Sequence, residues 1–152
     1  MRFGPLALSF GAISLAFSAS AQAQNAPRLT QAMFVERTSE SGTQRSIEPA
    51  ETLKKGDRVI LLVKWKSNSP HTSFTVASAV PAELAFERSS LRSQDISVDG
   101  GRNWGRIGQL TIEDYSGPRL ASVEDVTHLR WTITPDMAVR GKGTITYSAI
   151  VR

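Results

Sequence analysis

Few side chains in this chain of 152 residues could perform catalysis. There is no cysteine, and the only histidines are His71 and His128. A Ser–His–Asp triad needs one of them as a base beside a serine, and the Gly-x-Ser-x-Gly elbow of many hydrolases is absent from the sequence. We expect His71 to lie in a solvated turn next to Pro70, and His128 to lie on an outer strand face beside Arg130. The sequence therefore gives a hydrolase little support.

Carboxylates are the next candidates, because glycoside hydrolysis uses a pair of them. The available acids are Glu113, Asp114, Glu124 and Asp125. All four fall in polar turns, where acids are usually solvated or cap a helix. The acids do not alternate as they do in a calcium loop, no glycine-rich loop opens a helix, and cysteine ligands are missing. We predict no catalytic residue, no metal and no cofactor.

The sharpest local motif is Ser97-x-Asp99-x-Gly101-x-x-Trp104, which matches the pattern called the Asp-box. Glycines permit positive φ in a tight turn, and an aspartate can accept hydrogen bonds from turn amides. Asp-boxes are common in sialidase-like propellers, but one box cannot build a propeller of several blades. We predict a structural turn that Trp104 packs onto its sheet. A carbohydrate-contacting loop built around Trp104 is the alternative.

A second candidate surface lies on the strongest predicted strand, residues 58–66, which read RVILLVKWK. Val59 and Trp65 share one face with the residues between them at spacing two, and Lys64 and Lys66 share the other. Exposed lysines usually solvate a strand or protect an edge. They could instead recognise an anionic polysaccharide. His128 and Arg130 form a further weak candidate for surface binding.

Short alternating segments dominate the rest of the chain and predict an all-β fold. We expect an antiparallel β-sandwich of seven to nine strands, with one helical turn at residues 123–126 capped by Ser122 and a polar turn at 113–118. The first and last strands, near 33–35 and 145–151, are the expected sheet edges. The large core residues should be Trp65, Phe74, Phe86, Trp131 and Tyr147. The expected strands lie at 33–35, 58–66, 72–80, 84–86, 96–98, 107–112, 129–133 and 144–151.

The first 23 residues predict a cleaved secretory signal peptide. Arg2 precedes an uncharged, mostly apolar run at 5–17, and small residues lead up to Ala23. The run is short for a bilayer span, so an uncleaved anchor is the weaker alternative. Residues 24–152 then form one domain, without a transmembrane span, in the periplasm or at the cell surface. Its net charge of about +3 is spread along the chain and gives no basic stripe for nucleic acid.

Several stretches together resemble a known family. Gly56-Asp57-Arg58-Val59 opens the long strand, residues 97–105 carry the Asp-box, and residues 124–131 read EDVTHLRW. With residues 36–38 and 141–143, this resembles small exported proteins related to the conserved-repeat domain of bacterial cell-surface proteins, a domain of unknown function. The resemblance implies an immunoglobulin-like β-sandwich outside the cytoplasm and no known activity. Larger members carry several copies, whereas this chain carries one.

These observations favour a non-enzymatic envelope or cell-surface protein that acts through contacts with another envelope protein or with its own copies. A module that binds carbohydrate or another envelope polymer is the alternative. An enzyme is the weakest hypothesis, because the chain is poor in catalytic groups.

Overall fold

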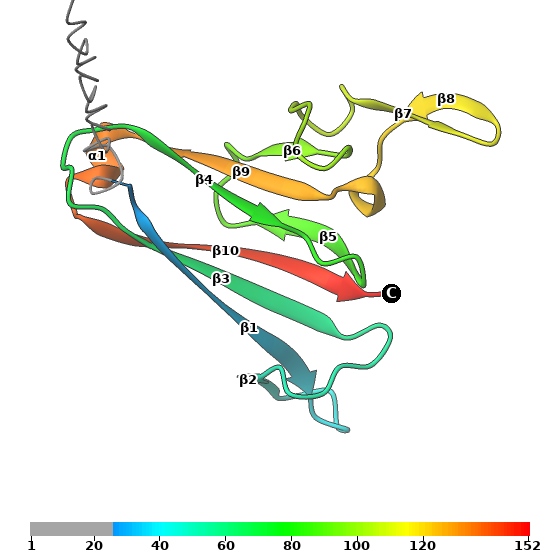
Figure 1. The fold of residues 1–152 in the computed structure, drawn as a ribbon. Helices are drawn as coiled ribbons and strands as arrows, with labels where there is room; N and C mark the ends of the chain where they lie inside the picture. The colour runs from blue at the N-terminus through cyan, green and yellow to red at the C-terminus, as the bar shows by residue number, and fades with distance from the viewer. Residues whose placement is uncertain (1–25) are drawn as a thin grey trace, which may run out of the picture.

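The fold is an all-β sandwich, described here by a computed structural model that covers residues 26–152 (Figure 1). The predicted signal peptide and its cleavage site lie outside the described residues. No helix within residues 26–152 is long and apolar enough to cross a membrane.

Sheet A has five antiparallel strands in the order β2-β1-β3-β10-β5. Its central strand is β3 (Arg58–Lys66), and the other four are β1 (Arg28–Thr38), β2 (Arg45–Pro49), β5 (Leu84–Ser89) and β10 (Lys142–Val151). In β3 the residues Val59, Leu61, Val63 and Trp65 are buried, whereas those between them are half-buried or exposed. This alternation gives sheet A one face toward the core and one face away from it.

Sheet B covers part of that inner face with three antiparallel strands in the order β4-β9-β6. These are β4 (Phe74–Ala79), β6 (Asp95–Ser97) and β9 (His128–Ile133). Leu129, Trp131 and Ile133 point inward from β9, while His128 and Arg130 on its opposite face are half-buried. The outward placement of His128 beside Arg130 agrees with the prediction from the sequence.

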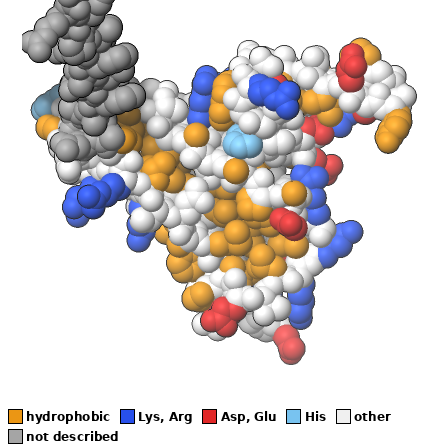
Figure 2. All heavy atoms as spheres, in the orientation of Figure 1, with side chains coloured by type: hydrophobic (Ala, Val, Ile, Leu, Met, Phe, Trp, Pro, Cys, Tyr) orange, Lys and Arg blue, Asp and Glu red, His pale blue; other side chains and the backbone are white. Residues whose placement is uncertain are grey.

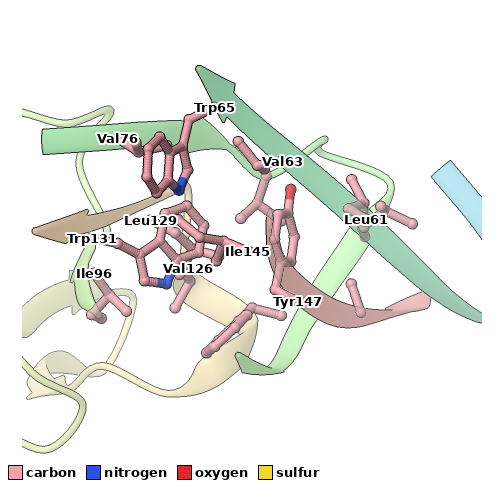
Figure 3. Packing of buried hydrophobic residues seen from close by; sticks show 14 of the residues in the cluster. Leu61, Val63, Trp65, Val76, Ile96, Val126, Leu129, Trp131, Ile145 and Tyr147 are labelled. Atoms are coloured by element: carbon pink, nitrogen blue, oxygen red, sulfur yellow. The ribbon is translucent and has the colours of Figure 1, made fainter. Parts of the chain in front are cut away.

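The core lies between the two sheets (Figure 3). Trp131 of β9 packs on Tyr147 of β10 with ring centroids 6.0 Å apart, and its Nε1 donates a hydrogen bond of 2.9 Å to Ser89 Oγ. Trp65 meets Phe74 edge-on at 5.2 Å. Of the five predicted core residues, four are buried and Phe74 is half-buried against the same cluster.

A separate hairpin projects from the sandwich (Figure 1). It consists of β7 (Thr111–Asp114) and β8 (Gly117–Leu120), and we call it the arm. The 3₁₀ helix η2 (Val123–Asp125) follows it, with Ser122 at its N-cap as the sequence predicted. The arm replaces the polar turn predicted at 113–118, since that turn is only the tip of a paired hairpin.

The sequence located β3, β4 and β9 well and missed other elements. β2 and the short helix α1 (Pro135–Ala138) were not predicted, and residues 26–152 contain ten strands where seven to nine were expected. The strand expected at 107–112 was wrong, because residues 107–109 form a turn and β7 begins only at Thr111. The expected edge strands were wrong: β1 lies between β2 and β3, and β10 lies between β3 and β5. The actual edges are β2 and β5 in sheet A, and β4 and β6 in sheet B.

Candidate functional site

The candidate residues from the sequence fall in two separate places. Ser97, Asp99, Gly101 and Trp104 come together with His128 and Arg130 on the outer side of sheet B, and we call this the Asp99 loop. Lys64 and Lys66 lie on the outer face of sheet A, at the end of β3. The two places differ in charge.

In the Asp99 loop the Asp99 carboxylate organises the turn. Its Oδ1 accepts hydrogen bonds from Ser97 Oγ at 2.8 Å and from the backbone N–H groups of Arg102 and Asn103 at 3.1 and 2.9 Å. Its Oδ2 accepts one from Asn103 Nδ2 at 2.6 Å. The hydrogen bonds from Asn103, followed by that from Ser97, hold the pKa of Asp99 far below its usual range. The carboxylate is therefore ionised and fully occupied inside its own turn.

The turn is also tied to the sandwich. Ser97 is fully buried, and its Oγ accepts a hydrogen bond of 2.8 Å from the N–H of Gly101. Thr127, just before β9, accepts from Gly100 N–H at 3.0 Å and donates to Ser97 O at 3.1 Å. Both Gly100 and Gly101 have positive φ, which only glycine adopts without strain. This geometry is that of a structural turn.

Trp104 closes the loop against β9. The guanidinium carbon of Arg130 lies 4.6 Å from the centroid of the Trp104 ring, and His128 meets that ring edge-on at 6.5 Å. Arg130 is held in turn by Asp95, with Arg130 Nη2 and Asp95 Oδ2 3.0 Å apart. Trp104 itself is half-buried. Of the three tryptophans, it is therefore the one that keeps a substantial surface toward solvent.

The second place is a basic groove formed by the outer face of sheet A. Lys66 pairs with Arg28 of β1 on one side and with Lys142 of β10 on the other. In the next row along the strands, Lys64 lies between Thr30 and Thr144. Like charges directly opposite in an antiparallel pair are destabilising, so the cationic row works against the fold.

Arg140 adds a fifth cation at the end of the groove. It lies in the turn between α1 and β10, where the carbonyl of Gly141 accepts a hydrogen bond of 2.8 Å from Ser67 N–H at the end of β3. The groove encloses about 690 Å³ and is lined by Arg28, Thr30, Lys64, Trp65, Lys66, Arg140, Lys142, Gly143 and Thr144. Among residues 26–152 no carboxylate lines it, although Asp136 lines a smaller cavity beside it that shares Arg140 and Lys142.

Several arginines elsewhere in the molecule are paired with carboxylates, whereas the cations of the groove are not. Arg37, Arg58, Arg119 and Arg130 all form ion pairs of 3.0 Å or less with carboxylates. Among residues 26–152, none of the five cations of the groove has a carboxylate within 4.0 Å. Figure 2 shows Lys and Arg side chains without Asp or Glu beside them at the end of the molecule where β3 ends.

Sequence reasoning found two of the five cations. Lys64 and Lys66 alternate on a strand that is easy to recognise. Arg28, Arg140 and Lys142 are distant in sequence and reach the groove only through the register of β1 and β10 on β3. The described part of the chain also holds no cluster of three or more His, Asp and Glu that could bind a metal ion.

Comparisons with protein-family models, with curated proteins and with solved structures find no match for this chain.

Proposed function

We propose that this protein is an exported, non-enzymatic binding protein of the cell envelope, and that its basic groove binds an anionic polymer such as an acidic polysaccharide. The observation that carries the proposal is the set of five cations, including the row Arg28–Lys66–Lys142, without any carboxylate in the groove lining. A concave surface lined by charges of one sign raises the local concentration of the opposite ion.

The groove suits a polymer better than a small anion. Its cations come from three strands and one turn and are all exposed, so they present separate charges along a surface instead of converging on one buried point. Thr30 and Thr144 flank Lys64 and offer hydroxyl groups to uncharged parts of the same chain. The predicted signal peptide at residues 1–23 supports export.

Binding is tested with dextran sulfate and polygalacturonate as anionic probes and neutral dextran as the control polymer, by isothermal titration calorimetry. Wild type should bind both anionic probes and not dextran. The double substitution Lys64→Glu and Lys66→Glu should weaken binding by about tenfold or more, since it places two acids among three remaining cations.

The matched control is Lys54→Glu with Lys55→Glu, which changes the net charge equally at two exposed lysines outside the groove. Equal losses in the two double variants would mean that net charge alone attracts the probes, and the groove would lose its role. Export is tested separately: cell fractionation and N-terminal sequencing should find a mature chain beginning at Gln24.

A second candidate is contact with another protein or with a second copy, and one observation favours it. The arm carries Tyr115 at its tip, where the side chain is fully exposed, and Leu120 at its base is 60 % exposed. Tyrosine gains much from burial in an interface at a small cost in conformational entropy. Tyr115→Ser should abolish any concentration-dependent association seen by light scattering, and a wild type that stays monomeric at high concentration would exclude self-association.

A further inference from the structure

A second cavity lies beside the Asp99 loop, on the side of sheet B away from the basic groove. It encloses about 580 Å³ between the loop and the base of the arm. Its apolar lining comes from Val98, Trp104, Leu110 and Ile112, and its polar lining from Asp99, Asn103, Gln109, Thr111 and Glu113. We propose that this cavity binds a neutral, hydroxyl-rich sugar, with Trp104 as its apolar platform.

The platform is fixed before any ligand arrives. Arg130 covers one face of the Trp104 ring at 4.6 Å, the ring of His128 lies perpendicular to it at 6.5 Å, and Asp95 holds Arg130. The ring can therefore lose little freedom when a sugar packs on its remaining surface in the cavity. An aromatic ring held in this way favours binding because the cost of ordering it has already been met by the fold.

The apolar lining at Leu110 is also fixed by the fold. Leu110 packs directly onto the backbone of Gly105, where an added Cβ would lie 2.9 Å from its Cδ2. The carbonyl of Leu110 accepts a hydrogen bond of 2.8 Å from Ala121 N–H, which closes the base of the arm. Leu110 is thus held by Gly105 on one side and by Ala121 on the other, and the cavity keeps its shape.

The polar lining selects the class of ligand. Asn103 and Gln109 supply amide donors and acceptors, and Thr111 supplies a hydroxyl, which together suit the hydroxyl groups of a sugar. Among the described residues, the two charged groups in the lining, Asp99 and Glu113, are both acids. An anionic sugar would be repelled here, so this cavity and the basic groove should take different ligands.

The protein is titrated with chitotetraose, cellotetraose and maltotetraose. Binding is measured by tryptophan fluorescence and by isothermal titration calorimetry. Trp65 and Trp131 are buried, so a fluorescence change on binding reports mainly on Trp104. Wild type should show saturable binding to at least one probe, and Trp104→Ala should weaken it by about tenfold or more.

Because Trp104→Ala also frees Arg130 and could loosen the loop, Gln109→Ala serves as a second variant. Gln109 is exposed, and its side chain makes no hydrogen bond within residues 26–152, so its removal should weaken sugar binding while thermal unfolding stays unchanged. Lys64→Glu with Lys66→Glu should leave sugar binding at the wild-type level, which separates this cavity from the groove. The proposal fails if no probe binds at about 10 mM, if both cavity variants bind like wild type, or if a cationic peptide binds there in place of the sugars.

Discussion

Gly143 of β10 lies directly opposite Trp65 of β3, and the tryptophan ring occupies the space where a side chain at position 143 would begin. A Cβ added to Gly143 would lie 2.5 Å from Cε2 and Cζ2 of the Trp65 ring. This contact lets a large aromatic ring stay buried at the end of sheet A, directly beneath the cations of the groove. The core and the groove thus meet at one residue pair.

Gly143→Ala should destabilise the fold by about 1–3 kcal/mol, because the ring of Trp65 must move within a packed core. Urea unfolding followed by tryptophan fluorescence measures the change. Thr144→Ala, next to it on the exposed face of the same strand, is the control and should change stability far less. If the two variants unfold alike, the ring does not depend on the glycine.

Lys66→Gln should stabilise the protein by about 0.2–1 kcal/mol, since it removes the central charge from the row Arg28–Lys66–Lys142. The same variant should bind dextran sulfate more weakly. A gain in the midpoint of urea unfolding together with a loss of binding would show that the row serves binding at the expense of stability. Lys55→Gln is the control, and loss of stability in Lys66→Gln would contradict the repulsion argument.

Added salt should relieve the repulsion within the row Arg28–Lys66–Lys142, and it should also weaken the binding of anionic polymers to the groove. Raising ionic strength from about 0.05 to 0.5 M shortens the Debye length to a few ångströms and screens exposed charges from one another. Binding of dextran sulfate should weaken steadily with added sodium chloride, and binding of a neutral sugar at Trp104 should not. Calorimetry at four salt concentrations checks this, and a salt-independent affinity for dextran sulfate would contradict an electrostatic groove.

Acid should weaken the Asp99 loop. Hydrogen bonds to the ionised carboxylate lower the pKa of Asp99 in the folded chain below its ordinary value of 3.8. They stabilise the fold above that ordinary pKa, and the stabilisation is lost as the pH falls through the folded pKa. The midpoint of thermal unfolding should fall between about pH 5 and pH 2, and less steeply in Asp99→Asn. Glu51→Gln, an exposed acid outside any ion pair of the described residues, should follow the wild-type curve.

Arg119→Ala should release the arm without unfolding the sandwich. Arg119 Nε lies 2.7 Å from Asp114 Oδ2, and its Nη1 lies 2.8 Å from Asp125 Oδ2, so one guanidinium joins the arm to η2. These charges are partly exposed, and exposed ion pairs add little to global stability. Hydrogen exchange should accelerate in β7 and β8 while the unfolding midpoint stays nearly constant. Unchanged exchange in the arm would mean that its own strand pairing holds it.

The elements that the sequence predicted correctly are those in which apolar and polar side chains alternate between the core and the solvent. β3 alternates buried and exposed residues over its whole length and has turn residues on both sides, so its position could be inferred from the sequence. β2 was missed because all five of its residues are exposed, which leaves no alternation to detect. The first strand of the arm was misplaced at 107–112, because residues 107–109 form a turn and Ile112 is the only half-buried residue in β7.

Strand order and the groove could not be predicted because they depend on pairing between distant segments. Nothing local in residues 33–35 indicates that β2 folds back to cover their free edge. The Asp99 loop is the opposite case, because most of its hydrogen bonds join residues within four positions of one another. The packing of Trp104 on Arg130 could not be predicted, because Arg130 lies on β9, far from the loop in the sequence.

β10 lies between β3 and β5 in sheet A, although it comes last in the sequence: all of sheet B and the arm separate it from β3, and β6, the arm and β9 separate it from β5. Pairing across so long a stretch closes a large loop, which slows folding. Until β10 arrives, β3 and β5 each leave a row of backbone amides and carbonyls without strand partners, and such edges template aggregation. A partly folded chain in which β10 has not yet paired would therefore be the form most exposed to aggregation through the edges of β3 and β5.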